Sequence, residues 1–194
     1  MADQTLSELF AAAEGGETGA FERAFTAIYG ELKRLARRQR ARSRPGDTLS
    51  TTVLVHEVFL KLSAGGALTI RDREHFFALA ARAMRQILVD AARTRAAAKR
   101  GGPAAVRVEL GEEDAAVAAV ADDVVALDRA LARLEAVDER LARLVEARYF
   151  AGLTDAEVAE LLGRNERTVR RDWEKARAFL LRELRGGAPP GTSA

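Results

Sequence analysis

Apolar residues recur along most of the chain at the three- and four-residue spacing of amphipathic helices. A clear example is the set Phe21, Phe25, Ile28, Leu32 and Leu35, which would share one side of a helix. Runs of Val, Ile and Thr, which are typical of strands, are few. The pattern therefore predicts an all-α fold. Helices are expected over about 3–13, 20–42, 50–62, 73–98, 124–134, 141–150, 154–162 and 165–180.

Breaks in this pattern predict two small helical domains joined by a flexible acidic linker. Gly101-Gly-Pro103 ends the first domain, and the segment up to 121 is rich in Ala, Val and Glu with weak periodicity. That segment is expected to be mostly extended or disordered. The predicted divisions are a short N-terminal helix and turn (1–19), a helical bundle (20–100), the linker (101–122), a helix-turn-helix domain (123–185) and a disordered tail (186–194).

Charge is strongly segregated along the chain although the formal net charge is only +2. Basic blocks lie at 33–44, 82–100 and 164–185, and an acidic block lies at 109–128. This separation suggests that some surfaces contact a polyanion. The block at 33–44 has a second explanation, because cations suit the negative end of a helix dipole. So many neighbouring cations repel one another, however, which favours a polyanion partner.

Several classes of protein are disfavoured by what the sequence lacks. The chain has no Cys, and its two His residues fall in different predicted helices without metal-ligand spacing. It has no phosphate-binding loop or nucleophile motif. No apolar run approaches the roughly 20 residues that span a bilayer, and the N-terminus does not resemble a signal peptide. We therefore expect a cytoplasmic protein without membrane contact, enzymatic activity, catalytic residues, metal or cofactor.

The stretch from Gly152 to Arg177 predicts a helix-turn-helix. Thr154 and Glu157 have the spacing of a capping box, Gly163 can end the first helix, and Asn165 can cap the second. The second helix would bury Val169, Trp173, Ala176 and Leu180 and present Arg167, Arg170 and Arg171 on the opposite side. Such a helix suits DNA recognition. A charged, solvated helix pair in an ordinary bundle has the same pattern, so this stretch alone leaves both interpretations open.

Two features of the first domain indicate further contacts. In the helix over 50–62, Val53 and Leu60 fall on the nominally polar side, where either a neighbouring helix or a partner protein could cover them. The helix over 73–98 follows a loop and carries a His and several Arg on one side. Such side chains next to a loop suit both unstacked bases and phosphates.

Three motifs in this order resemble those of the bacterial extracytoplasmic-function (ECF) sigma factors, a subfamily of the sigma-70 family of RNA polymerase subunits. Leu54-Val-His-Glu-Val-Phe-Leu-Lys-Leu62 is similar to the family's D-L-V-Q-E-V-F-L-R-L helix of region 2. The run from Leu79 to Asp90 is similar to W-L-x-x-I-A-x-N-x-x-x-D, and the predicted helix-turn-helix is similar to region 4. The resemblance covers about 20–185.

The resemblance implies a sigma factor that binds core RNA polymerase through its β′ and β subunits and directs promoter-specific initiation. It implies contact with the β′ subunit through Val53, His56, Glu57, Leu60 and Lys61. It implies melting and capture of the −10 element by Arg71, Asp72, Arg73 and His75, with Arg82, Arg85 and Arg93 as phosphate contacts. It implies recognition of the −35 duplex by Arg164, Asn165, Arg167, Thr168, Arg170, Arg171 and Lys175.

The chain departs from the family pattern at several positions. Leu79 replaces a Trp, Gln86 an Asn and His56 a Gln. An acidic pair that commonly precedes the polymerase-docking motif is replaced by Ser50-Thr-Thr-Val53. A phosphoryl group on Ser50, Thr51 or Thr52 would add about −1.5 to −2 charge.

These departures bear on regulation and on the alternative functions. We predict activation by a Ser/Thr kinase, the alternatives being that uncharged docking suffices or that an anti-sigma factor regulates the protein. The alternative function is a helix-turn-helix transcription regulator, with a sensory first domain, that does not join polymerase.

Overall fold

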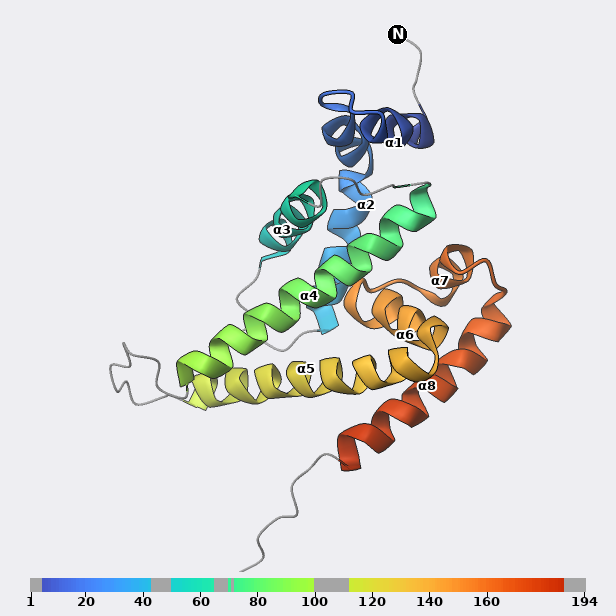
Figure 1. Cartoon of the computed structure of the whole chain (residues 1–194). Coiled ribbons are helices and arrows are strands. Elements are labelled where there is room, and N and C mark those ends of the chain that lie inside the picture. Colours follow the sequence, from blue (N-terminus) through green and yellow to red (C-terminus); the bar gives the residue numbers. More distant parts are fainter. Residues whose placement is uncertain (1–4, 43–49, 65–69, 71, 100–111, 187–194) are drawn as a thin grey trace, which may run out of the picture.

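The computed structural model describes residues 5–42, 50–64, 70, 72–99 and 112–186. All regular structure in these ranges is helical, as predicted (Figure 1). The elements are α1 (Leu6–Glu14), α2 (Ala20–Arg42), α3 (Thr51–Ala64), α4 (Arg73–Lys99), α5 (Glu112–Val137), α6 (Glu139–Val145), the π-helical turn η1 (Glu146–Phe150), α7 (Asp155–Leu161) and α8 (Glu166–Gly186).

Polar side chains fix where several helices begin. Thr5 and Glu8 form a reciprocal capping box at α1, and Thr154 and Glu157 form the predicted one at α7. Asp138 caps α6 by accepting a hydrogen bond from the backbone N–H of Leu141 at 3.1 Å. Each cap satisfies backbone donors that the first turn of a helix leaves without an intrahelical partner.

Aromatic side chains from α1, α2 and α4 form the centre of the first core. Phe76 is fully buried and stacks on Phe10 with ring centroids 5.4 Å apart. Phe25 meets Phe76 at 6.3 Å and Phe59 of α3 at 4.9 Å, both edge to face. Such pairs add specific geometry to the burial of large apolar surfaces. They tie the first four helices into one bundle.

The two halves of the chain are packed against each other. In Figure 1, α5 runs beside α4, and η1 and α7 also contact α4. Leu153 and Val158 from the second half are buried in the core that α1–α4 build. A second core contains Leu131 and Phe150 from the second half, with Leu88 of α4 partly buried against it. The halves therefore share apolar contacts as well as polar ones.

Part of the segment predicted to be a flexible linker is helical. Residues 112–121, expected to be extended or disordered, belong to α5, while 101–111 lie outside the described residues. The sequence explains the difference, because the segment from Glu112 is rich in Ala, which has the highest helix propensity. Its acidic start also suits the positive end of a helix dipole. Of the predicted tail (186–194), Gly186 is the last residue of α8, and 187–194 lie outside the described residues.

Candidate nucleic-acid interface

The helix-turn-helix is built by α7, a tight turn and α8. Gly163 has φ +59°, in the left-handed region that glycine adopts without steric cost, and it ends α7 as predicted. The side chain of Asn165 accepts a hydrogen bond from the backbone N–H of Thr168 at 2.8 Å and so caps α8. Both local predictions for this turn are confirmed.

The two sides of α8 differ as the sequence predicts. Val169, Ala176 and Leu180 are buried and Trp173 is half-buried. Five of the seven residues predicted to contact the −35 element are exposed cations, of which Arg164 lies in the turn before α8 and Arg167, Arg170, Arg171 and Lys175 lie on α8. The other two, Asn165 and Thr168, share the capping hydrogen bond. The exposed side can therefore present several guanidinium groups to one ligand.

Acidic residues restrain two of these cations. Arg170 pairs with Glu166 at 2.8 Å and lies 3.5 Å from the carboxylate of Asp155. Lys175 lies 3.9 Å from Asp172. The guanidinium groups of Arg167 and Arg171 are both exposed, which makes them the better candidates for contacts to bases or phosphates.

Contacts that the sequence pattern did not reveal orient α8. Arg140 of α6 donates to the buried carboxylate of Asp172, with Nη1 and Oδ2 2.5 Å apart. Arg148 lies over the ring of Trp173, 4.4 Å from its centroid, and pairs with Asp155 at 2.6 Å. Because removal of one partner from a buried ion pair is costly, the Arg140–Asp172 pair fixes the rotation of α8 on α6. Asp172 is one of four acidic residues in α8, with Glu166, Glu174 and Glu183, so the sequence pattern did not single it out.

The predicted docking side of α3 is exposed. Val53 and Leu60 each retain 44% of their accessible surface, and no helix of the described chain covers them. His56, Glu57 and Lys61 are exposed beside them. A groove lined in part by Leu60, Lys61 and Ile87 separates this side of α3 from α4. Of the two explanations given above, cover by a neighbouring helix is thus wrong for the described structure.

The three hydroxyl residues at the start of α3 surround its N-terminus. The Ser50 hydroxyl accepts a hydrogen bond from the backbone N–H of Val53 at 3.2 Å. Ser50 and Thr52 are exposed, and Thr51 is half-buried. The first turn of a helix favours added negative charge.

The residues predicted to contact the −10 element have more varied surroundings. Arg71 lies outside the described residues. Asp72 is the N-cap of α4, because its carboxylate accepts a hydrogen bond from the backbone N–H of His75 at 2.6 Å. Arg73 pairs with Glu31 and lies over the ring of Phe77, 5.0 Å from its centroid. His75 is half-buried and lines, with Arg82, a cavity of about 350 Å³ between α4 and α6.

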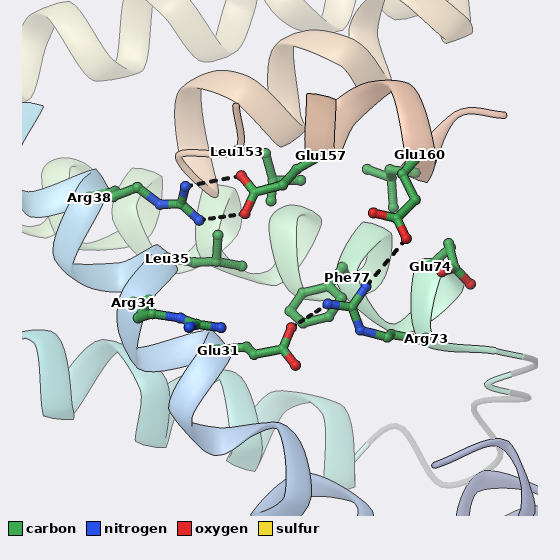
Figure 2. Close-up of a pocket in the computed structure, with 11 residues that line it drawn as sticks. Glu31, Arg34, Leu35, Arg38, Arg73, Glu74, Phe77, Leu153, Glu157 and Glu160 are labelled. Atoms are coloured by element: carbon green, nitrogen blue, oxygen red, sulfur yellow. Dashed lines mark hydrogen bonds and ion pairs between the residues drawn. The ribbon is translucent and has the colours of Figure 1, made fainter. Parts of the chain in front are cut away.

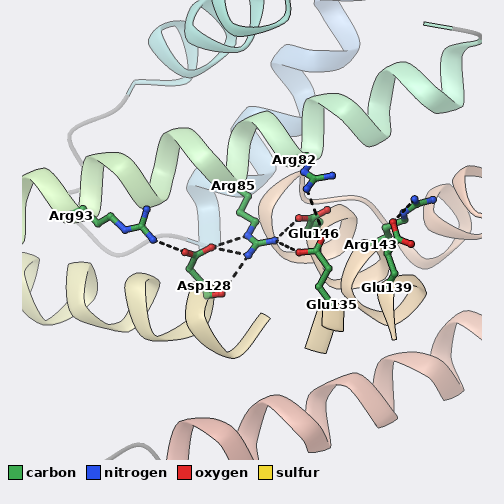
Figure 3. Close-up of polar contacts among 8 residues, drawn as sticks. All are labelled: Arg82, Arg85, Arg93, Asp128, Glu135, Glu139, Arg143 and Glu146. Carbon is green, nitrogen blue, oxygen red and sulfur yellow. Dashed lines mark hydrogen bonds and ion pairs between the residues drawn. The ribbon is translucent and has the colours of Figure 1, made fainter. Parts of the chain in front are cut away.

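Arg85 is buried between α4 and the second half (Figure 3). Its guanidinium group pairs with Asp128 at 2.8 Å and with Glu146 at 2.6 Å. Burial opposes the charge, but the hydrogen bonds to Glu146 and Asp128 raise the pKa of Arg85 above its ordinary value. Arg85 therefore stays charged here and is not accessible to DNA. Its predicted contact with phosphate requires α4 and α5 to separate.

A second set of ion pairs holds α7 to the first half (Figure 2). Arg38 of α2 donates to both carboxylate oxygens of Glu157, at 3.0 and 2.8 Å. Partial burial alone would raise the pKa of Glu157, but the hydrogen bonds from Arg38 and from Thr154 lower it to about 2. Glu157 thus serves both the capping box of α7 and a contact between the halves.

Within the described residues, no group of three or more His, Asp or Glu is arranged to hold a metal ion. No helix in the same ranges is both long and apolar enough to cross a membrane.

The α7–α8 pair is a helix-turn-helix whose second helix exposes several arginine side chains, the arrangement found in DNA-binding proteins of this class. A sequence model of the family described as "ECF sigma factor" matches residues 3–186, nearly the whole chain. The chain belongs to this family, whose members are factors for transcription initiation by RNA polymerase. Comparison with curated proteins and with solved structures gives no significant match.

Proposed function

We propose that this sigma factor holds core RNA polymerase through α3 and recognises a two-part promoter. In this proposal the exposed side of α8 contacts the −35 duplex in the major groove. The loop before α4 and the Arg residues of α4 capture the melted strand of the −10 element, with bases flipped into a protein pocket. The exposed cations of α8 support the proposed contact with the −35 duplex, and the Arg residues of α4 support the proposed contact with the −10 strand.

The observation that carries the proposal is the exposed apolar side of α3, formed by Val53 and Leu60. A sigma subunit would use these apolar residues to bind its polymerase partner, which would cover them. A helix-turn-helix regulator could use them instead to hold a second copy, since many such regulators bind DNA as dimers, so co-purification with core polymerase separates the two functions. Isolated apolar residues are common on surfaces, but here they adjoin a groove and three polar residues of one docking motif.

Substitution of both apolar residues, Val53→Asp with Leu60→Asp, is expected to abolish promoter-specific initiation. Two carboxylates in an apolar interface would remain without partners and would cost several kcal/mol of binding. The measurement is run-off transcription with purified core polymerase, using promoters mapped after overexpression in cells, together with co-purification of the polymerase.

Val137→Asp is the matched control, because Val137 is also apolar and is 73% exposed but lies at the end of α5. It should leave both readouts unchanged. Wild-type protein that binds promoter DNA but gives no initiation with core polymerase would instead support the regulator alternative.

We further propose that phosphorylation at Ser50, Thr51 or Thr52 activates docking. A phosphate here would lie at the N-terminus of α3, where the helix dipole favours negative charge. It would also lie one to three residues from Val53, at the start of the docking side. The exposure of Ser50 and Thr52 makes these hydroxyls accessible to a Ser/Thr kinase.

The triple substitution Ser50→Asn/Thr51→Ala/Thr52→Ala is expected to lower transcription in cells by about tenfold or more. Asn keeps the N-cap of α3, so loss of the cap does not contribute to the result. Replacement with Asp at Thr51 and Thr52 should restore part of the activity. Reporter output from the mapped promoter and mass spectrometry of the purified protein measure both effects. Unchanged output from the triple variant would contradict the kinase proposal and would leave regulation to an anti-sigma factor or to uncharged docking.

A further inference from the structure

The acidic residues of the second half contact the basic side of α4. Asp128 of α5 pairs with Arg85 at 2.8 Å and with Arg93 at 2.9 Å (Figure 3). Glu135, two helical turns further along α5, lies 3.6 Å from both Arg82 and Arg85. The three Arg residues expected to hold DNA phosphates therefore all have carboxylate partners in the other half of the chain.

The centre of this contact is deeply buried. Arg85 retains 8% of its accessible surface and Glu146 retains 7%. Asp128 accepts from two guanidinium groups at once, through different carboxylate oxygens. Carboxylates and phosphates bind Arg through the same charge-assisted hydrogen bonds, so these acidic residues satisfy the donors that a DNA backbone would otherwise use.

Further ion pairs between the two halves hold α7 against α2 and α4. Arg38 and Glu157 form the two hydrogen bonds described above, and Arg73 lies between Glu31 of α2 and Glu160 of α7 (Figure 2). Arg73 is a fourth residue expected at the −10 element. The cations of α8 at Arg167, Arg170, Arg171 and Lys175, in contrast, are exposed and, in the part of the chain that the structure describes, take no part in the contacts to α4. The packing thus buries Arg85 and pairs the still exposed Arg82 and Arg93 with carboxylates of the other half, whereas Arg167 and Arg171 of α8 are exposed.

We propose that the free protein is autoinhibited by its own second half. Asp128, Glu135 and Glu146 occupy the Arg side chains of α4 in the closed conformation, and α4 can hold single-stranded DNA only after α5 and η1 move away. Binding to core polymerase would favour the open conformation. The inference rests on the proposed use of α4 at the −10 element, but the closed conformation itself can be tested without polymerase.

The test variant is Asp128→Asn with Glu146→Gln, in full-length protein. It preserves the shapes of both side chains and removes the two closest counter-charges of Arg85, so that in the closed conformation only Glu135 of the described carboxylates, at 3.6 Å, still opposes the charge of this buried guanidinium group. Opening returns Arg85 to water, so the substitutions shift the equilibrium toward the open conformation. We expect the apparent Kd for a fluorescein-labelled single-stranded DNA oligonucleotide to fall by about tenfold.

Opening is measured separately by energy transfer between dyes on Ala27→Cys in α2 and Ala178→Cys in α8. Both positions are exposed, and the chain has no other Cys. The test variant should show lower energy transfer than the wild type. Adding Arg82→Ala and Arg93→Ala to it should remove the gain in DNA binding while the dyes still report opening.

Glu183→Gln is the matched control, because Glu183 pairs with Arg133 at 2.6 Å within the second half and away from α4. It should change neither readout. Unchanged energy transfer in the test variant, or opening without a gain in single-strand binding, would each overturn the inference. If the proposed sigma function is wrong but the closed conformation is real, the test variant would still show lower energy transfer than the wild type. Wild-type protein would then show no loss of energy transfer on addition of core polymerase.

Discussion

Replacement of Arg167 and Arg171 by Ala is expected to reduce promoter-specific transcription by about 100-fold or more. Both side chains are exposed on the outer side of α8, opposite its buried apolar stripe. A good bidentate contact to a base contributes roughly 1–3 kcal/mol of discrimination, and a phosphate contact adds salt-dependent affinity. Run-off transcription at two salt concentrations measures the loss and shows how much of it is electrostatic.

The double variant Arg133→Ala/Arg143→Ala removes the same charge from exposed positions in the same half of the chain. It should retain most of the activity if the position of the guanidinium groups on α8 matters more than net charge. Equal losses in the two double variants would argue against a recognition role for α8. Far-ultraviolet circular dichroism should show unchanged helix content in both.

Phe76→Ala is expected to destabilise the first half by about 3–5 kcal/mol, the usual cost of truncating a fully buried Phe. Phe76 has no accessible surface, and its ring contacts those of Phe10 and Phe25. The cavity would lie where α1, α2 and α4 meet, so neighbouring side chains cannot fill it without moving helices. Urea unfolding followed by circular dichroism measures the loss.

Tyr29→Ala is the comparison, because Tyr29 is an aromatic residue of α2 that retains 36% of its surface. Its loss should cost less than about 1 kcal/mol, as is usual for surface positions. A similar loss in the two variants would mean that the core around Phe76 does not dominate the stability of this half.

Local sequence patterns were sufficient for most of the helices, although not for the start of α5, and for the helix-turn-helix. Thr154, Glu157, Gly163 and Asn165 act within a few residues of themselves, and each has the structural role that its chemistry predicts. The spacing of Val169 and Ala176 likewise predicted the buried side of α8. Such features depend on backbone geometry over one or two turns, which sequence periodicity records directly.

Contacts between distant segments were not predictable in the same way. Arg85 and Glu146 are 61 residues apart, and nothing in either neighbourhood specifies the other. Arg85 was therefore expected at a DNA phosphate, although it is buried against carboxylates. The capping role of Asp72 was not predicted, although its place directly before a helix is the normal position of an N-cap residue. Its expected role came from the family resemblance alone.

A moderate fall in pH is not expected to break the ion pair that holds α7 to α2. The low pKa of Glu157 means that its ion pair with Arg38 adds stability above the ordinary carboxyl range and loses it only as the pH falls toward about 2. Across the pH range in which cells live, the contribution of this carboxylate is constant. Both partners are more than one-third exposed, so dissolved salt can screen them. A rise in ionic strength is therefore expected to weaken this contact more than mild acidification does.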